Sequence, residues 1–181
     1  MDVVEAVRAR RSIRCYKPEP IPPEKEAALL EALGLSPSAG NRQPWRFILV
    51  RDPELIRRLA QECSWERLAP LRALTTAPLV IVGCGVPGES VPVGSLDGDI
   101  VDVVIALQSA VLAATGLGLG TCWIGAFYEK RVKALLGVPE EARVIALLAV
   151  GMPDESPLAK GRKEPTEVFY SDIYGTPYTG P

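Results

Sequence analysis

The sequence of 181 residues contains no histidine. That absence removes the usual general base of serine and cysteine hydrolases, the commonest metal ligand, and the side chain that most often carries protons near neutral pH. If the chain is an enzyme, we therefore expect a bound cofactor to supply the difficult chemistry, with no catalytic side chain and no metal.

Cysteine is scarce, and long apolar runs are absent. The four cysteines, Cys15, Cys63, Cys84 and Cys122, form no C-x-x-C pair, which fits free thiols in a reducing compartment. The formal net charge of −2 gives the whole protein no attraction for nucleic acid. No apolar run reaches about 18 residues and the N-terminus is acidic, so we expect no membrane helix, no signal peptide and a cytoplasmic location.

The order of apolar patterns predicts a single domain of mixed α and β structure over residues 1–181. Apolar residues recur at helical spacing in five segments: 2–10, 24–34, 53–59, 100–114 and 129–136. Other segments are expected to be extended: 45–50, 77–84 and 144–151 as buried strands, with shorter pieces at 12–16 and 121–125. Because helices alternate with strands, one central sheet is expected.

The C-terminal part of the chain, residues 152–181, is polar and ends in aromatic residues: Phe169, Tyr170, Tyr174 and Tyr178. It has no obvious core of its own, so it packs back on the domain or wraps a partner subunit. A floppy tail is the alternative, although aromatic residues are unusual in disordered segments.

The segment 36–44 combines small turn residues with two amide side chains, Asn41 and Gln43, and runs directly into the strand that begins at Trp45. Glycine, asparagine and serine favour turn geometry. A solvated turn ahead of a strand is the simpler interpretation. A flat polar ligand with alternating donors and acceptors is the other, because such a ligand would satisfy both amides.

The residues 83–88 match the pattern G-x-G-x-x-G directly after a predicted strand. A dinucleotide-binding loop needs a helix to begin at these glycines, so that its N-terminus faces the pyrophosphate. Pro87 and Pro92 oppose such a helix. We therefore expect this match to be accidental, and a nucleotide-binding module built on it is the weakest alternative.

Four arginines surround Ser12 at the end of the first predicted helix: Arg8, Arg10, Arg11 and Arg14. Charge runs are usually solvated helix faces. However, arginine forks and a hydroxyl at a helix exit also suit a phosphate monoester. A second basic group, 160–163, is distant in sequence. If the two groups meet, about four or five cations would surround one phosphate.

Four motifs together make the chain resemble the nitroreductase family of FMN-dependent oxidoreductases: 10–14, 37–45, 116–125 and 160–162, in family order. The resemblance covers residues 3 to 168. It implies an α+β, nitroreductase-like fold in which helices flank a central, mostly antiparallel sheet. It also implies a homodimer with two FMN sites at its interface. A C-terminal tail of about 165–181 would pack on the partner and complete the edge of its sheet.

The resemblance also implies which residues hold FMN. Arg10 and Ser12 would bind the phosphate together with Lys160 and Arg162, assisted by Arg11. Arg14 would lie near the N1/O2 edge of the flavin ring. Ser38, Asn41 and Gln43 would contact the ring or the ribityl chain, in part from the other subunit. Ile124 and Gly125 would lie near N5.

The function that the resemblance implies is an oxidoreductase that takes hydride from NAD(P)H and reduces a nitroaromatic, quinone or similar conjugated acceptor by a ping-pong mechanism. The chain is short for the family, and the segment 87–97 replaces a region that often shapes the substrate mouth. Two alternatives therefore stay open. One is a specialised member, such as a dehydrogenase, dehalogenase or flavin-destroying enzyme, and the other is an FMN-binding or flavin-sensing protein without turnover.

Overall fold

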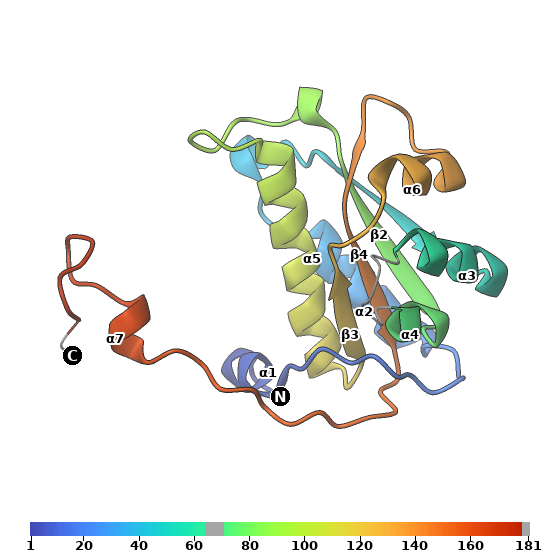
Figure 1. Ribbon diagram of the computed structural model, residues 1–181, viewed down its shortest axis with the longest axis horizontal. Coiled ribbons are helices and arrows are strands. Elements are labelled where there is room, and N and C mark those ends of the chain that lie inside the picture. Colours follow the sequence, from blue (N-terminus) through green and yellow to red (C-terminus); the bar gives the residue numbers. More distant parts are fainter. Residues whose placement is uncertain (64–70, 179–181) are drawn as a thin grey trace.

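Four antiparallel strands form the centre of the protein (Figure 1). The computed structural model describes residues 1–63 and 71–178. The strands lie in the order β1-β2-β4-β3, with the bounds β1 Trp45–Val50, β2 Leu79–Gly85, β3 Gly120–Ile124 and β4 Arg143–Gly151. Every pairing between neighbours is antiparallel. The expected α+β class with a central antiparallel sheet is confirmed.

Helices cover both faces of this sheet (Figure 1). One face carries α2 (Pro23–Gly34) and α5 (Gly98–Gly116), whose apolar residues share a core cluster with Leu79, Ile81 and Leu148. The other face carries α3 (Pro53–Glu62), α4 (Leu71–Thr75) and α6 (Glu129–Leu136). The first helix, α1 (Val3–Ala9), packs against α5. Two short 3-10 helices, η1 (Ala39–Asn41) and η2 (Pro87–Glu89), lie in loops.

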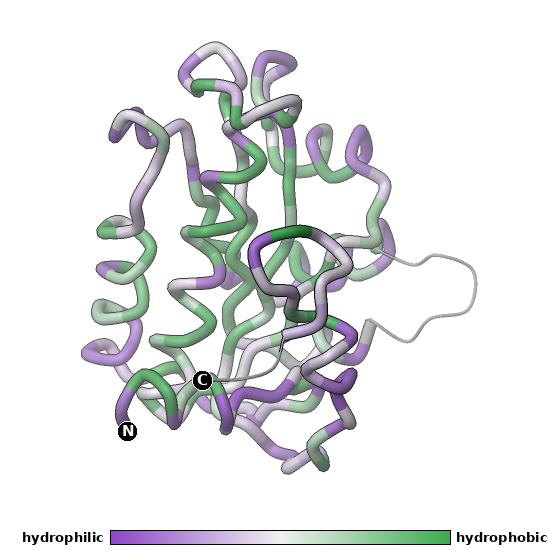
Figure 2. The backbone as a smooth tube through the Cα atoms, turned by 90° about the vertical axis from the view of Figure 1, so that its left-hand side faces the viewer, coloured by the Kyte–Doolittle hydropathy of each residue, from purple (hydrophilic) through white to green (hydrophobic). Residues whose placement is uncertain are grey.

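The central helix α5 crosses the sheet and contacts β2, β3 and β4. Its apolar residues recur at helical spacing, and nine of its residues are buried. By length and composition alone this 19-residue helix could cross a membrane, although it contains no uninterrupted apolar run of that length. Its packing against the sheet identifies it as a core helix, and apolar residues run through both layers of this core (Figure 2).

The first two glycines of the G-x-G-x-x-G match allow close packing between α5 and the sheet. Gly83 and Gly85 both lie within β2. A Cβ atom at Gly83 would lie 2.8 Å from Leu107 Cδ1, and one at Gly85 would lie 2.5 Å from Asp99 Oδ2. The strand is followed by η2, three residues long, so no α-helix begins at the glycines. The geometry of a phosphate-binding loop is therefore absent here.

The C-terminal segment leaves the sheet after β4, passes below α1 and projects beyond it (Figure 1). It contains the four-residue helix α7 (Pro165–Val168) and an aromatic hairpin. In that hairpin the rings of Phe169 and Tyr178 are 6.2 Å apart, and those of Tyr170 and Tyr174 are 4.8 Å apart. Tyr174 is 88% exposed. Exchange of this tail with a partner stays a prediction.

Replacing Gly83 by alanine should destabilise the protein by about 1–3 kcal/mol, because the new methyl group has to displace buried side chains of α5. Gly88→Ala is the matched control from the same motif, since a Cβ atom at Gly88 would meet nothing within 4 Å. Urea unfolding of both variants measures the difference. Equal losses of unfolding free energy would contradict the packing role.

Candidate functional site

The two basic segments expected at a phosphate meet in one cavity of about 420 Å³. Residues from both ends of the described chain line it: Val7, Arg8, Arg10, Arg11, Ser12, Arg14, Pro157, Leu158, Ala159, Lys160 and Arg162. None of these residues is acidic. The predicted meeting of 10–14 with 160–162 is therefore present within a single chain.

The first wall of the cavity is the exit of α1. This helix begins at Asp2, where a reciprocal capping box with Glu5 satisfies the first backbone donors. It ends at Arg10, whose ψ of 131° turns the chain into an extended conformation. Ser12 then forms an isolated parallel bridge with Thr121 of β3, and Ile13 N donates to Thr121 O at 2.8 Å. The strand thus fixes the position of the arginines.

The second wall is the start of the C-terminal segment, which backbone contacts hold beside residues 14–17. Lys17 N donates to Met152 O, and Asp154 N donates to Cys15 O, both at 2.9 Å. The carboxylate of Glu155 also accepts from the backbone N–H of Arg14. These contacts direct the following residues, 157–162, across the end of α1.

Tyr16 anchors the basic segment to the core. It is 4% exposed, and its hydroxyl lies 2.7 Å from Ile13 O and 3.2 Å from Ala149 O, so its single proton is shared between carbonyls of the two segments. Its ring packs against Gly151, where a Cβ atom would lie 2.9 Å from Tyr16 Cδ1. Burial raises the pKa of Tyr16, so the hydroxyl stays a neutral donor.

The electrostatics of the cavity favour an anion. Among the described residues, Arg10, Lys160 and Arg162 make no ion pair, so their charges are not neutralised locally. Arg11 differs, because its Nη1 atom donates to the carbonyls of Arg8 and Arg10 at 2.7 and 2.8 Å. It caps the end of α1, which matches an assisting role better than a direct one.

Residues 36–44, here called the amide loop, lie at the opposite end of α5 from this cavity. Ala39 N contacts Asp102 in the first part of α5, whereas Ser12 pairs with Thr121, just beyond the C-terminal end of that helix. A helix of 19 residues is about 28 Å long. Ser38, Asn41 and Gln43 therefore do not line the cavity of their own chain.

Within the loop the backbone takes an uncommon conformation. Gly40, Asn41 and Gln43 have φ values of 58°, 55° and 50°, in the left-handed region. Ser38 Oγ accepts from Gln43 N at 2.9 Å, and the Gln43 side chain donates to Asn41 O at 3.2 Å. Asn41 and Gln43 are exposed, so their remaining polar atoms are free to contact a ligand.

Ile124 and Gly125 lie at the far end of edge strand β3, away from Ser12. Ile124 is buried in the core, whereas Gly125 is exposed. A Cβ atom at Gly125 would meet only the ring of Trp123, at 3.6 Å. The backbone at Gly125 is therefore open to close approach by a ligand, but neither residue lines the basic cavity.

Comparison with known proteins identifies the family. The model of the nitroreductase family matches residues 7–80 and 66–152. This chain belongs to the nitroreductase family. It is 32% identical to 5,6-dimethylbenzimidazole synthase of Rhodospirillum rubrum over 81% of this chain and 79% of the relative. It is 31% identical to an NADH dehydrogenase of Thermus thermophilus over 86% and 88%.

A solved structure agrees with this assignment. The FMN-dependent nitroreductase from Clostridium difficile R20291 superposes with a TM-score of 0.81 at 29% identity, covering 94% of this chain and 99% of that chain. Nitroreductase family membership and the nitroreductase fold, both expected from the motifs, are confirmed. The relatives carry several different activities in their names, so membership alone does not define the acceptor.

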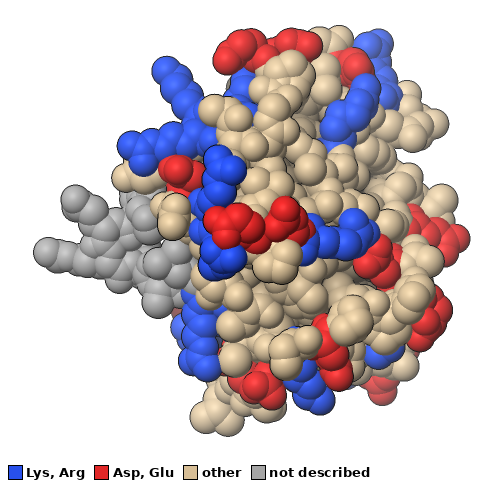
Figure 3. All heavy atoms as spheres, turned by 90° about the vertical axis from the view of Figure 1, so that its right-hand side faces the viewer, with Lys and Arg blue, Asp and Glu red and all other residues tan. Residues whose placement is uncertain are grey.

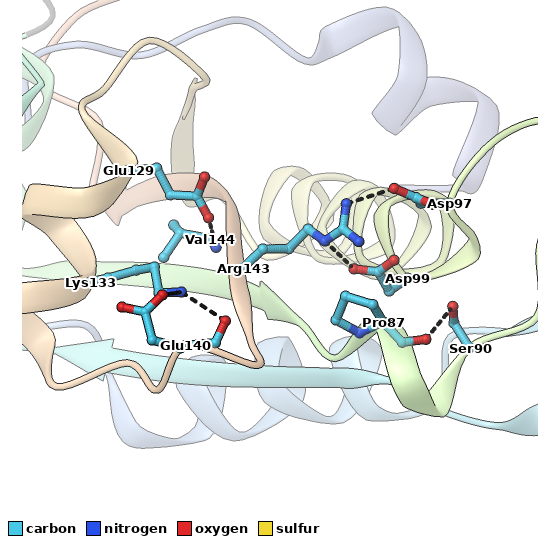
Figure 4. Close-up of polar contacts among 9 residues, drawn as sticks. All are labelled: Pro87, Ser90, Asp97, Asp99, Glu129, Lys133, Glu140, Arg143 and Val144. Carbon is cyan, nitrogen blue, oxygen red and sulfur yellow. Dashed lines mark hydrogen bonds and ion pairs between the residues drawn. The ribbon is translucent and has the colours of Figure 1, made fainter.

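Two buried carboxylates at the start of α5 were not expected from the sequence. Asp99 is fully buried, and Asp102 is 2% exposed. Arg143 bridges Asp97 and Asp99, with distances of 2.7 Å to Asp97 Oδ2 and 3.1 Å to Asp99 Oδ2 (Figure 4). Asp97 occupies the N-cap position, but its side chain binds Arg143 instead of the helix backbone. The signal in the sequence was that Asp99 and Asp102 stand at the helical spacing of the buried face of α5.

The surface formed by α3 and α6 differs from the basic cavity. On its described atoms, positive and negative side chains are interspersed (Figure 3). Arg57 pairs with Glu54, and Arg131 pairs with Glu62 while its guanidinium lies over the Tyr128 ring. Both of these arginines have an acidic partner, whereas Arg10, Lys160 and Arg162 at the cavity have none among the described residues.

Three of the four cysteines, Cys63, Cys84 and Cys122, are buried and should be poor nucleophiles, and their reactivity tests this. Burial raises the pKa of Cys63 to about 12 and that of Cys84 to about 11, and it also raises the pKa of Cys122. At pH 8 a thiol with a pKa near 11 is about one part in a thousand thiolate. With Ellman's reagent, the half-exposed Cys15 should react fast and the other three slowly. The fast phase should vanish in Cys15→Ser; fast reaction of two or more thiols would contradict this burial.

Proposed function

We propose that this protein is an FMN-dependent oxidoreductase that takes hydride from NAD(P)H and reduces nitroaromatic, quinone or similar conjugated acceptors. The observation that carries the proposal is the basic cavity built from both ends of the chain. A cytoplasmic homodimer with two FMN sites at its interface completes the proposal.

The cavity fits the phosphate end of FMN. Arg10, Lys160 and Arg162 supply positive charge without acidic partners among the described residues, and Ser12 adds a hydroxyl. Arginine and lysine form strong charge-assisted hydrogen bonds with phosphate. We assign these four residues to the FMN phosphate, with Arg11 supporting the backbone beside them.

The ring end of FMN would need the loop of a second subunit. Ser38, Asn41 and Gln43 stand at the other end of α5 from the cavity of their own chain, so a partner in the opposite orientation would bring them to it. The outer face of α5 supports such a partner, because Ile100, Val104 and Ile105 are 37%, 39% and 37% exposed. Exposed apolar surface on a core helix is typical of an interface.

The C-terminal tail fits the same assembly. Its aromatic hairpin projects beyond α1, and both Ile173 and Tyr174 are largely exposed at 73% and 88%. Burial of these side chains against a second copy would favour association. We propose that residues of about 165–181 pack on the partner subunit and extend its sheet at an open edge.

Bound FMN would supply hydride and electron transfer, which the side chains of this protein do not provide. The Arg14 guanidinium, exposed beside Ser12, would stabilise negative charge at the N1/O2 edge of the ring. The backbone at Gly125 admits a flat ring without a side chain in the way, and its N–H would face N5. The donor and the acceptor would use one open face in turn, in a ping-pong order.

The purified protein, or protein incubated with FMN, should be yellow and should lose its flavin absorbance anaerobically when NADH or NADPH is added. A quinone should then restore the colour. Absorption spectroscopy with both nicotinamides checks the result. Colourless protein that takes up no FMN would contradict the proposal. Tight FMN binding with no loss of flavin absorbance on addition of either nicotinamide would indicate a flavin-binding protein without turnover.

Arg10→Gln should weaken FMN binding by about tenfold or more, since one charge-assisted contact contributes about 1.5–3 kcal/mol. Binding of riboflavin, which lacks the phosphate, should hardly change. Arg57→Gln is the matched control, because that arginine pairs with Glu54 on α3, away from the cavity. Fluorescence titration measures both ligands.

Mixing variants tests whether the site is shared between subunits. The Arg10→Gln and Gln43→Ala homodimers should each be impaired. Random subunit exchange makes about half of the dimers mixed, and each mixed dimer contains one unaltered site and one doubly altered site, so activity should rise toward about a quarter of wild type. No gain, with exchange verified by mass spectrometry, would mean that both residues serve the same chain's site.

A further inference from the structure

Asp102 joins the core of the protein to the amide loop. Its side chain is 2% exposed, and Oδ1 accepts a hydrogen bond from the backbone N–H of Ala39 at 3.1 Å, across 63 residues of sequence. We propose that Asp102 is a positioning residue that holds Asn41 and Gln43 in the conformation that binds flavin. This inference rests on the proposed function.

The loop has few other ties to the body of the protein. Among the described residues, Ser36 bonds back to α2, and Val86 N donates to Pro44 O at 2.8 Å at the far end of the loop. Between these points, the contact with Asp102 is the one hydrogen bond from the loop to another element within residues 1–63 and 71–178. The position of the loop relative to α5 therefore depends on this carboxylate.

The conformation of the loop needs such an anchor. Gln43 has a φ of 50°, a value that is unfavourable for a residue with a full side chain, and Asn41 has a φ of 55°. Backbone of this kind persists where surrounding contacts over-determine it. Ala39 directly precedes the left-handed residues, so the hydrogen bond to Asp102 restrains the chain at the point where the unusual turn begins.

The burial of Asp102 shows that the contact is specific. Burying a carboxylate costs free energy unless hydrogen bonds compensate it, and Asp102 Oδ2 has no hydrogen-bond partner among the described residues. Its neighbours on the inward face of α5, Val103 and Ala106, are fully buried apolar residues. A carboxylate at this position is poorly suited to packing alone, whereas its Oδ1 atom is well placed for the Ala39 N–H.

The anchor also links the loop to the proposed dimer interface. Asp102 faces the inner side of α5, whereas Ile100 and Val104, two residues before and after it, are exposed on the outer side. A rigid helix that carries both groups fixes the distance between the interface and the loop. Docking of a partner on α5 would thus place the amides of Asn41 and Gln43 at a defined position relative to the partner's cavity.

Three variants test the role. Asp102→Leu removes the acceptor but keeps the branched shape at Cγ, while Asp102→Asn keeps an oxygen that can accept from Ala39 N. Asp99→Asn is the matched control, because Asp99 is buried one turn earlier on α5 and pairs with Arg143 instead of the loop. FMN affinity by fluorescence titration, the circular dichroism of the bound flavin, thermal stability, and deuterium uptake of residues 36–44 in the protein without FMN are measured for all three.

We expect Asp102→Leu to raise the Kd for FMN by about tenfold, to alter the flavin dichroism and to speed deuterium uptake in the loop. Asp102→Asn should restore all three toward wild type. Asp99→Asn should lower thermal stability with FMN affinity within about threefold of wild type. Unchanged loop exchange in Asp102→Leu, failure of Asp102→Asn to restore it, or an equal loss of FMN affinity in Asp99→Asn would overturn the proposal.

The two proposals fail in different ways. If wild-type protein binds no FMN, the proposed function is wrong, and the deuterium uptake of the loop still reports whether Asp102 anchors it. If wild-type protein binds FMN normally but Asp102→Leu binds it equally well, the proposed function stands and the positioning role is wrong.

Discussion

The close packing of α5 on the sheet is the contact on which the other features depend. Gly83 leaves room for Leu107 and Val103 of the helix, and Gly85 leaves room for Asp99. With α5 in place, its C-terminal end leads to β3, which fixes Ser12, while Asp102 near its N-terminal end holds Ala39. One helix therefore positions both halves of the proposed cofactor site, and interiors packed at such density transmit displacements instead of absorbing them.

The basic cavity owes its character to how its walls are held. Backbone hydrogen bonds between 15–17 and 152–154 bring the two segments together. The charged groups of Arg10, Lys160 and Arg162 beyond them have no acidic partners among the described residues. The positive side chains of the cavity repel one another, and the backbone hydrogen bonds hold them together despite this repulsion. A bound dianion would reduce the repulsion. Because this cavity and the amide loop are separated along α5, the proposed flavin site takes its loop from a second copy of the chain.

Much of the fold follows from local pattern. Apolar residues at helical spacing in 100–114 predict a helix with one buried face. The short continuous apolar runs at 45–50, 77–84 and 144–151 predict buried strands. Both patterns depend only on residues close together in the sequence. The sheet order β1-β2-β4-β3 is different, because it depends on how distant segments cross over each other. The burial of Asp99 and Asp102 was not predicted either, because a charged residue normally lies on the outer face of a helix.

The sequence by itself determined the family, the basic character of 10–14 and 160–162, and the amides at Asn41 and Gln43, since residue identity and spacing carry that information directly. Only the tertiary structure decided that the two basic segments share a cavity, that the amides stand at the far end of α5, and that Asp102 reaches Ala39. The physical reason is that such contacts join residues many positions apart. Their formation depends on the packing of the whole core and not on the preferences of any one segment.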